Sequence, residues 1–222
     1  MEAVADTRTK LLEAALETLS TSGISGASAR AIAAAAGVNQ ALVFYHFGSV
    51  DQLLSAACAH GSTRRVERYR DRFAAVTTLR ELLDLGREVH AEEAAEGNVA
   101  ALAQLLAGSQ TDDKLAPAVV AGLNLWIAEV EQALARVLAN SPLAEFVDVA
   151  GLAKATAAAF VGLELYEGVD GDGAAQALDA LEQLAVLVTA LEDMGPVARR
   201  AVRARLTRSI GPRSRSRPDQ EK

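Results

Sequence analysis

Cysteine and aromatic residues are scarce in this chain of 222 residues. It has one cysteine, five phenylalanines, three tyrosines and one tryptophan. A single thiol, Cys58, excludes an intramolecular disulfide, and with only His60 nearby there are too few ligands for a structural zinc site. We therefore expect no metal and no other cofactor. The hydrophobic core must be built mainly from aliphatic side chains.

Targeting segments and catalytic motifs are missing as well. The N-terminus, MEAVADTRTK, lacks the basic segment and apolar run of a signal peptide, and no stretch approaches the roughly 20 apolar residues of a membrane span. The sequence contains no G-x-S-x-G elbow, no P-loop and no H-E-x-x-H pair. We therefore expect a soluble, cytoplasmic protein that is not an enzyme and has no membrane partner.

Basic residues are outnumbered except at the C-terminal end. The chain carries 22 Lys and Arg residues against 29 Asp and Glu, yet residues 196–222 hold nine basic and two acidic residues. The rest of the chain is therefore strongly acidic. Such a body does not favour general affinity for nucleic acid, although a local DNA-reading surface is compatible with it. Residues 211–222 are expected to form a basic disordered tail.

Hydrophobic residues make up 50% of the chain, and they recur at spacings of three and four. This periodicity is typical of amphipathic helices. Glycine, proline and capping residues divide the chain into segments with helical patterns, at residues 6–22, 28–36, 39–47, from 49 into the 60s or 70s, 79–93, 99–106, 118–138, 149–165, 174–191 and in a short basic stretch after 196. The predicted fold class is all-α.

The first 50 residues have the organisation of a helix-turn-helix. Ser28 is placed to cap a short helix, Gly37 to end it in a tight turn, and Asn39 to cap a third helix. On that third helix, Val43 and Phe47 should face a small core, with part of Phe44 beside them. The pattern predicts a three-helix DNA-binding domain over residues 1–50, whose third helix enters a major groove.

Residues 28–54, SARAIAAAAGVNQALVFYHFGSVDQLL, resemble the DNA-binding segment of the TetR family of transcriptional regulators. The resemblance lies in the capping serine, Ile-Ala, Ala-Gly-Val, the aromatic-aromatic-His-Phe turn and the Leu-rich helix that follows. It implies an N-terminal reading head and a helical domain, over residues 51–210, that binds a small effector and dimerises. It also implies that the aromatic-His turn clamps the DNA backbone and that effector binding releases the DNA.

The expected DNA-binding residues are Ser28, Arg30, Asn39, Gln40, Leu42, Tyr45 and His46. Gln40 suits a bidentate contact to adenine and Leu42 an apolar contact to a thymine methyl group, although neither pairing is assigned. Phe44 stands where the family commonly has tyrosine, and Val50 where a lysine is usual. Because residues 1–50 hold three basic and four acidic residues, DNA affinity should rest on helix N-termini, hydroxyls and Arg30, with a shallow salt dependence.

Polar residues that interrupt the apolar helices of residues 51–210 are candidates for an effector pocket. They are His90, Gln104, Asn124, Trp126 and Tyr166. Each has an alternative role: Trp126 falls in an apolar series typical of a core residue, and His90, beside two glutamates, is compatible with a solvated position.

The second half of this region also contains two apolar stripes that favour a dimer interface. The interface residues we expect are Ala155, Ala159, Gly162, Leu178, Leu181, Ala185 and Val188. The alternative is that both stripes pack within one subunit.

These features lead to a functional hypothesis: a homodimeric, ligand-responsive regulator, most simply a repressor that a small-molecule effector releases from a palindromic operator. The alternative is a helical small-molecule-binding or interaction module with little specific affinity for DNA.

Overall fold

The computed structural model describes residues 2–110, 113, 115–139, 141, 144–192 and 195–210. These residues form ten helices: α1 (Glu2–Gly26), α2 (Ala29–Ala35), α3 (Ala41–Phe47), α4 (Val50–Ala75), α5 (Leu79–Ala95), α6 (Asn98–Ser109), α7 (Ala116–Leu138), α8 (Val149–Glu167), α9 (Gly171–Glu192) and α10 (Pro196–Ile210). The predicted all-α class is confirmed, and the predicted helices match the observed ones to within a few residues. The predicted tail, 211–222, lies outside the described residues.

Four of the helix starts follow from side-chain caps. The hydroxyl oxygens of Ser28 and Ser49 accept hydrogen bonds from backbone N–H groups in the first turns of α2 and α4. Thr78 and Glu81 form a complete capping box at the start of α5. Asp170 accepts a hydrogen bond from the Gly173 N–H at the start of α9. Helix α9 therefore begins a few residues before the predicted start at 174, with Asp170 as the cap of its first turn.

Glycine bends α1 rather than ending it. The helix was expected to stop at Ser22-Gly23, but helical residues continue to Gly26. Gly23 itself is not helical, since its φ is 66° and its ψ is −178°. Only glycine adopts this backbone conformation at low cost. The regular helix is thus interrupted at Gly23, as predicted, but the chain continues beyond it into a short final turn that ends at Gly26.

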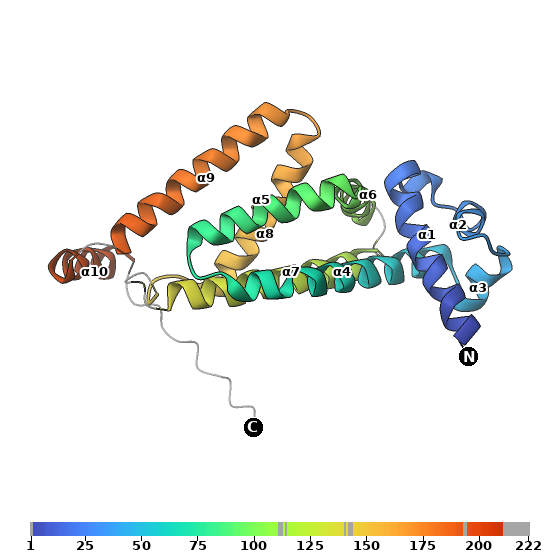
Figure 1. Cartoon of the computed structure of the whole chain (residues 1–222), viewed down its shortest axis with the longest axis horizontal. Coiled ribbons are helices and arrows are strands. Elements are labelled where there is room, and N and C mark those ends of the chain that lie inside the picture. Colours follow the sequence, from blue (N-terminus) through green and yellow to red (C-terminus); the bar gives the residue numbers. More distant parts are fainter. Residues whose placement is uncertain are drawn as a thin grey trace, which may run out of the picture.

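Helices α1, α2, α3 and the beginning of α4 share one hydrophobic core at one end of the elongated molecule (Figure 1). Leu11, Leu19, Ile32 and Val43 are fully buried in it. Residues of α6, α7 and the loop before α7 belong to the same core, namely Ala101, Leu105, Leu115 and Val119. The N-terminal head is thus packed directly against the helices of the larger, C-terminal body.

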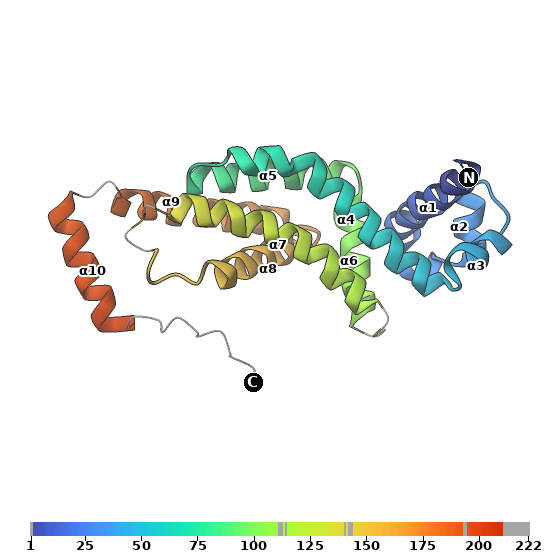
Figure 2. The same cartoon turned by 90° about the horizontal axis from the view of Figure 1, so that it is seen from below.

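The body is built around α4 and α7, which lie side by side along much of their length (Figures 1 and 2). At Gly122 of α7 the two helices approach so closely that a Cβ atom would lie 2.6 Å from the Ser62 hydroxyl oxygen. A second hydrophobic core, centred on Tyr69 and Phe73 of α4 and Leu134 of α7, continues the contact. Helices α5 and α8 pack beside this pair, and α9 packs on α5 and α8.

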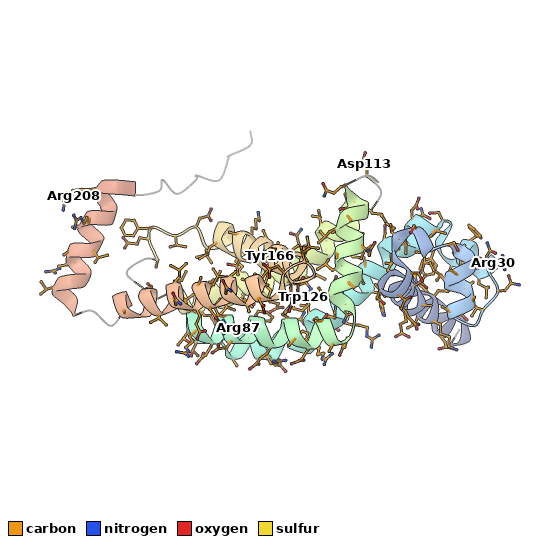
Figure 3. The ribbon with its side chains drawn as sticks, turned by 90° about the horizontal axis from the view of Figure 1, so that it is seen from above. Arg30, Arg87, Asp113, Trp126, Tyr166 and Arg208 are labelled. Atoms are coloured by element: carbon orange, nitrogen blue, oxygen red, sulfur yellow. The ribbon has the colours of Figure 1, made fainter. Side chains whose placement is uncertain are left out.

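Helix α10 lies at the end of the molecule opposite the head (Figure 2). Figure 3 shows Arg208 of α10 and Arg30 of α2 at opposite ends. The basic C-terminal helix and the N-terminal head of one subunit are therefore far apart.

Two body helices are long and apolar enough to cross a membrane by length and composition alone, α7 and α8. The expectation that no stretch approaches this threshold was therefore wrong. In α7 the apolar window is 28% buried, whereas in α8 it is 6% buried. Helix α7 is a core helix of the body, and α8 shows an apolar face that its own subunit leaves uncovered.

Candidate DNA-reading surface and ligand cavity

The exposed side of α3 is set by two buried residues. Val43 and Phe47, four residues apart, face the core as predicted, with exposed fractions of 0% and 8%. The residues between them must point outward, and Tyr45 is the most exposed at 77%. Its ring meets the His46 ring edge-on. Phe44 is 49% exposed, so its expected core contribution is small.

The predicted DNA-binding residues lie on one continuous part of the chain around the α2–α3 turn. Gly37, with a φ of 65°, forms the turn, and the Asn39 carboxamide oxygen accepts a hydrogen bond from the Ala41 N–H. Ser28, Arg30, Asn39, Gln40 and Tyr45 are exposed, whereas Leu42 and His46 are half-buried. Leu42 packs partly against the core, which leaves less of it for a base contact.

Few cations of the head are free for DNA. Lys10 forms an ion pair with Asp6 at 2.6 Å. The Arg8 guanidinium lies over the Phe47 ring, 5.1 Å from its centre. Arg30 is exposed and forms no ion pair among the residues that the structure describes. It is therefore the cation of the head best placed for a phosphate.

The body encloses a cavity of about 360 Å³ between α4, α5, α6, α7 and α8. Its wall is mainly aliphatic and aromatic, and includes Leu82, Val89, Leu105, Leu123, Trp126 and Phe160. A mainly apolar cavity of this size with a few polar groups is typical of a small-molecule site. Leu152 and Leu184 also line it while being 38% and 58% exposed, so the cavity opens toward α8 and α9.

Two of the five predicted ligand residues, His90 and Trp126, line the cavity. Figure 3 shows Trp126 within the body. Trp126 also packs against Tyr69, 5.8 Å between ring centres, so its core role and its cavity role coincide. His90 is half-buried and contacts glutamates of α8, not solvent alone.

The other three predicted ligand residues do not line this cavity. Gln104 lies on the side of α6 that faces the α1 kink, with its amide oxygen 3.1 Å from a Cβ built at Gly23. Asn124 is exposed on α7. Tyr166 is 46% exposed, and its hydroxyl donates a hydrogen bond to Asp170. Helical phase explains the difference, because polar residues on an apolar helix usually mark its outer face.

Three polar side chains, Arg65 and Glu93 of the cavity wall and Tyr69 beside them, interact with one another, and the charges of Arg65 and Glu93 cancel. The Arg65 Nε atom lies 3.3 Å from the Glu93 carboxylate, and the Tyr69 hydroxyl donates to the same carboxylate at 3.0 Å. Burial raises the pKa of Glu93, while the Arg65 charge opposes this shift. Burial, followed by the hydrogen bond to Glu93, raises the pKa of Tyr69. The three groups hold each other in place at the junction of α4 and α5.

A second polar group joins α5 to α8. His90 faces Glu167 with Nε2 and Glu164 with Nδ1, the latter at 3.5 Å. The Nδ1 atom is buried and makes no hydrogen bond to any described residue. Glu164 lines the cavity, and burial raises the pKa of its carboxyl, against the opposing effect of His90.

Several cavity residues were not predicted from the sequence, above all Glu164, Arg65 and Phe160. Glu164 could have been predicted from the sequence, because it is an acidic residue inside the apolar run FVGLELY. Arg65 could not have been predicted, since nothing in the sequence distinguishes it from the five other arginines in residues 64–80. The single cysteine, Cys58, is buried in the cavity wall, and burial raises its pKa, in keeping with an unreactive thiol.

The predicted dimer residues lie on α8 and α9, where an apolar face is exposed. Ala155, Ala159 and Gly162 are exposed along one side of α8, and a Cβ built at Gly162 would meet no atom within 4 Å. On α9, Leu178 is half-buried and Leu181 is 37% exposed. The side chains of Ala185 and Val188 lie outside the described residues.

A helix-turn-helix head, joined through α4 and α6 to a helical body with a cavity, defines a class: a two-part, all-α DNA-binding transcriptional regulator. Residues 11–57 match the family of bacterial regulatory proteins called the tetR family. These residues therefore form a DNA-binding domain of the tetR type. This match covers most of α1, all of α2 and α3, and the start of α4.

Solved structures of transcriptional regulators share the fold over most of the chain. A TetR-family regulator from Rhodococcus sp. matches with a TM-score of 0.68 at 22% identity, over 82% of this chain and 99% of that one. The transcriptional regulator FadR from Bacillus subtilis, in complex with stearoyl-CoA, matches with a TM-score of 0.66 at 16% identity, over 80% and 97%. No curated protein matches the sequence.

Proposed function

We propose that this protein is a homodimeric repressor that binds a palindromic operator and releases it when a small molecule enters the body cavity. The observation that supports this most directly is that the cavity and the head share structural elements. Cys58 of α4 and Ala101 and Leu105 of α6 are in the head core and in the cavity wall at once. A ligand that displaces these residues also displaces the head.

The mechanism we propose is a linkage between ligand binding and head geometry. A dimer presents two α3 helices to half-sites about one DNA turn, roughly 34 Å, apart. A ligand that binds better to a dimer with another spacing lowers DNA affinity, by no more than its own difference in affinity for the two states. In this scheme Arg30, Ser28, Asn39, Tyr45 and His46 hold the backbone, while Gln40 and Leu42 face the bases.

We propose the exposed apolar face of α8 and α9 as the dimer interface. Exposed small residues on α8 allow close approach of a second helix, and a monomer would leave Leu165, Leu181 and Val186 in contact with water. Because Leu152 and Leu184 belong both to this side of the molecule and to the cavity wall, dimer geometry and ligand binding would be coupled there. Residues 1–50 and 51–210 remain our proposed division into head and body.

The proposal is tested by selecting bound sequences from random duplex DNA with the purified full-length protein at near-physiological salt. We expect an enriched palindrome whose half-sites lie about one turn apart. If nothing is enriched even at low salt, a helical small-molecule-binding module with little specific DNA affinity is the better description. A cytoplasmic location follows from the DNA-binding role and stands or falls with it.

The interface has its own test, the mass of the protein in solution. Leu181→Glu should convert the dimer to a monomer that binds the palindrome poorly, since it places a charge on the apolar face. Val120→Glu is a matched control, because Val120 is 54% exposed but lies on α7. A Leu181→Glu protein that keeps the dimer mass places the interface elsewhere.

A further inference from the structure

The cavity wall presents aromatic rings together with carboxylates. Trp126, Phe73 and Phe160 all line the cavity, as do Glu93 and Glu164. The faces of aromatic rings carry negative electrostatic potential and attract cations. The rings and the carboxylates thus both favour a positively charged ligand.

Negative charge at the α5–α8 end of the cavity exceeds the positive charge. The single imidazole of His90 lies between the carboxylates of Glu164 and Glu167. Even doubly protonated, it carries one positive charge against two negative ones. Neither glutamate forms an ion pair with a lysine or arginine in the part of the chain that the structure describes.

The other carboxylate of the wall does not offset this excess. Glu93 and Arg65 neutralise each other at 3.3 Å, and the Tyr69 hydroxyl occupies a further lone pair of Glu93. Arg87 of α5 does not line the cavity, and its guanidinium forms ion pairs with Asp179 and Glu182 of α9, each at 3.0 Å. Glu164 is therefore the one carboxylate that lines the cavity and lacks a full counter-charge among the described residues.

We propose that the cavity binds an organic cation, an amine or quaternary ammonium group on an apolar body, with Glu164 as its counter-charge. This inference deepens the proposed function and rests on it, since it takes the cavity to be the effector site. The apolar body lies against the leucines and valines of the wall. The cationic group lies at the α5–α8 end, beside Glu164, and gains from the nearby rings.

The same charges disfavour anionic ligands. A carboxylate or phosphate at this end of the cavity would face Glu164 and Glu167 with only His90 between them. Arg65 is not free to receive such a group without separating from Glu93, which would leave a buried carboxylate unpaired. The stearoyl-CoA seen with the Bacillus subtilis protein is thus a poor guide to the head group that this cavity accepts.

Three probes of the same chain length and different charge provide the test: decyltrimethylammonium, decanol and decanoate, each below its micelle-forming concentration. Trp126 is the only tryptophan of the chain and lines the cavity, so its emission reports binding directly. Calorimetric titration of the full-length protein gives a second readout. We expect the ammonium probe to bind at least about tenfold more tightly than decanol, and decanoate to bind most weakly.

Glu164→Gln should reduce affinity for the ammonium probe about tenfold and leave affinity for decanol within about twofold. Glu167→Gln is the matched control, because Glu167 also contacts His90 but is 49% exposed and does not line the cavity. Its effect on the ammonium probe should be no more than about twofold. Equal losses in both variants would overturn the role of Glu164 as the counter-charge.

The outcomes separate this inference from the proposed function, because the emission and calorimetric readouts need no DNA. If decanoate or decanol binds as tightly as the ammonium probe, or if none of the three binds, the cation site is overturned. If the ammonium probe binds but the selection from random DNA enriches no palindrome, the cation site stands and the repressor role fails.

Discussion

The head and the α8–α9 layer use similar sequence patterns with opposite results. In α1, Leu11 and Leu19 recur at helical spacing and are fully buried. In α9, Leu181 and Leu184 recur at the same kind of spacing, yet they are 37% and 58% exposed. Helix α1 packs against α2, α4 and α6, whereas α9 packs only on α5 and α8 among its principal contacts. Periodicity therefore predicts which face of a helix is apolar, but not what covers it.

The sharpest way to test this difference is to remove the same side chain from both regions. Leu11→Ala should lower the free energy of unfolding by about 3 kcal/mol, because it leaves a cavity in a fully packed core. Leu181→Ala should lower it by less than about 1 kcal/mol in the monomer, since part of this side chain is already in water.

Urea denaturation at protein concentrations well below the dimer dissociation constant measures both variants. At higher concentration the Leu181→Ala protein should show an additional, concentration-dependent loss. Equal losses for the two variants at low concentration would mean that α9 is covered within its own subunit.

A second comparison uses glycine. Gly122→Ala should destabilise the protein by about 2 kcal/mol, because the new methyl group would lie 2.6 Å from the Ser62 hydroxyl oxygen and force this buried side chain to move. Gly162→Ala on α8 should instead stabilise the monomer by up to about 1 kcal/mol, since alanine is the better helix former and nothing lies within 4 Å.

Thermal denaturation followed by circular dichroism gives both values. A destabilised Gly162→Ala monomer would show that this side of α8 is crowded within one subunit. If Gly162→Ala weakens only the dimer, close approach of a second α8 is the simplest explanation.

The cavity wall, unlike the head core, contains buried carboxyl groups, and the one on Glu164 predicts a dependence of stability on pH. Burial raises the pKa of Glu164, so the folded protein holds this proton more tightly than the unfolded chain does. Stability from this group is thus present below the unfolded pKa of about 4.3 and is lost as pH rises through the folded pKa.

Glu164→Gln should remove this loss and raise stability at pH 7 by about 1 kcal/mol, or roughly 2–4 °C in Tm. The gain should shrink toward pH 4, where Glu164 is protonated in both states. Tm measured between pH 4.5 and pH 7.5 tests this, with His90, Glu93 and Glu167 unchanged in both proteins. If the difference in Tm between the two proteins were the same at every pH in that range, the pH dependence could not be assigned to Glu164. Greater stability with poorer cation binding would be a trade-off set by one residue.

The smallest expected effects are on the reading surface. If Tyr45 contacts a phosphate as we propose, Tyr45→Phe should weaken binding to all DNA sequences by about 0.5–1 kcal/mol, because it removes one hydroxyl and leaves the ring in place. Gln40→Ala should mainly change which sequences are preferred, as expected for a residue that contacts a base edge. Binding to a panel of selected sequences at fixed salt distinguishes the two, and the reverse pattern would exchange their roles.

Much of the fold depends on interactions between residues close together in the chain, and could therefore be predicted from the sequence. Ser28 caps α2 as predicted, and Ser49 and Thr78 cap α4 and α5 in the same way, because a cap involves only the adjacent turn. Gly37 and Gly48 have positive φ at the two turns of the head. Burial of Val43 and Phe47 followed from a spacing of four on a short helix. In each case the interaction partners lie within a few residues of each other.

The cavity was decided by tertiary structure. His90 and Glu164 are far apart in the chain, and only the packing of α8 on α5 brings their side chains together. Gln104 and Tyr166 are polar residues in apolar helices, as Glu164 is, but helical phase turns them away from the cavity. Composition and spacing specify the helices and their apolar faces. Which polar residue lies inside depends on how long-range packing rotates each helix, and no local pattern records that rotation.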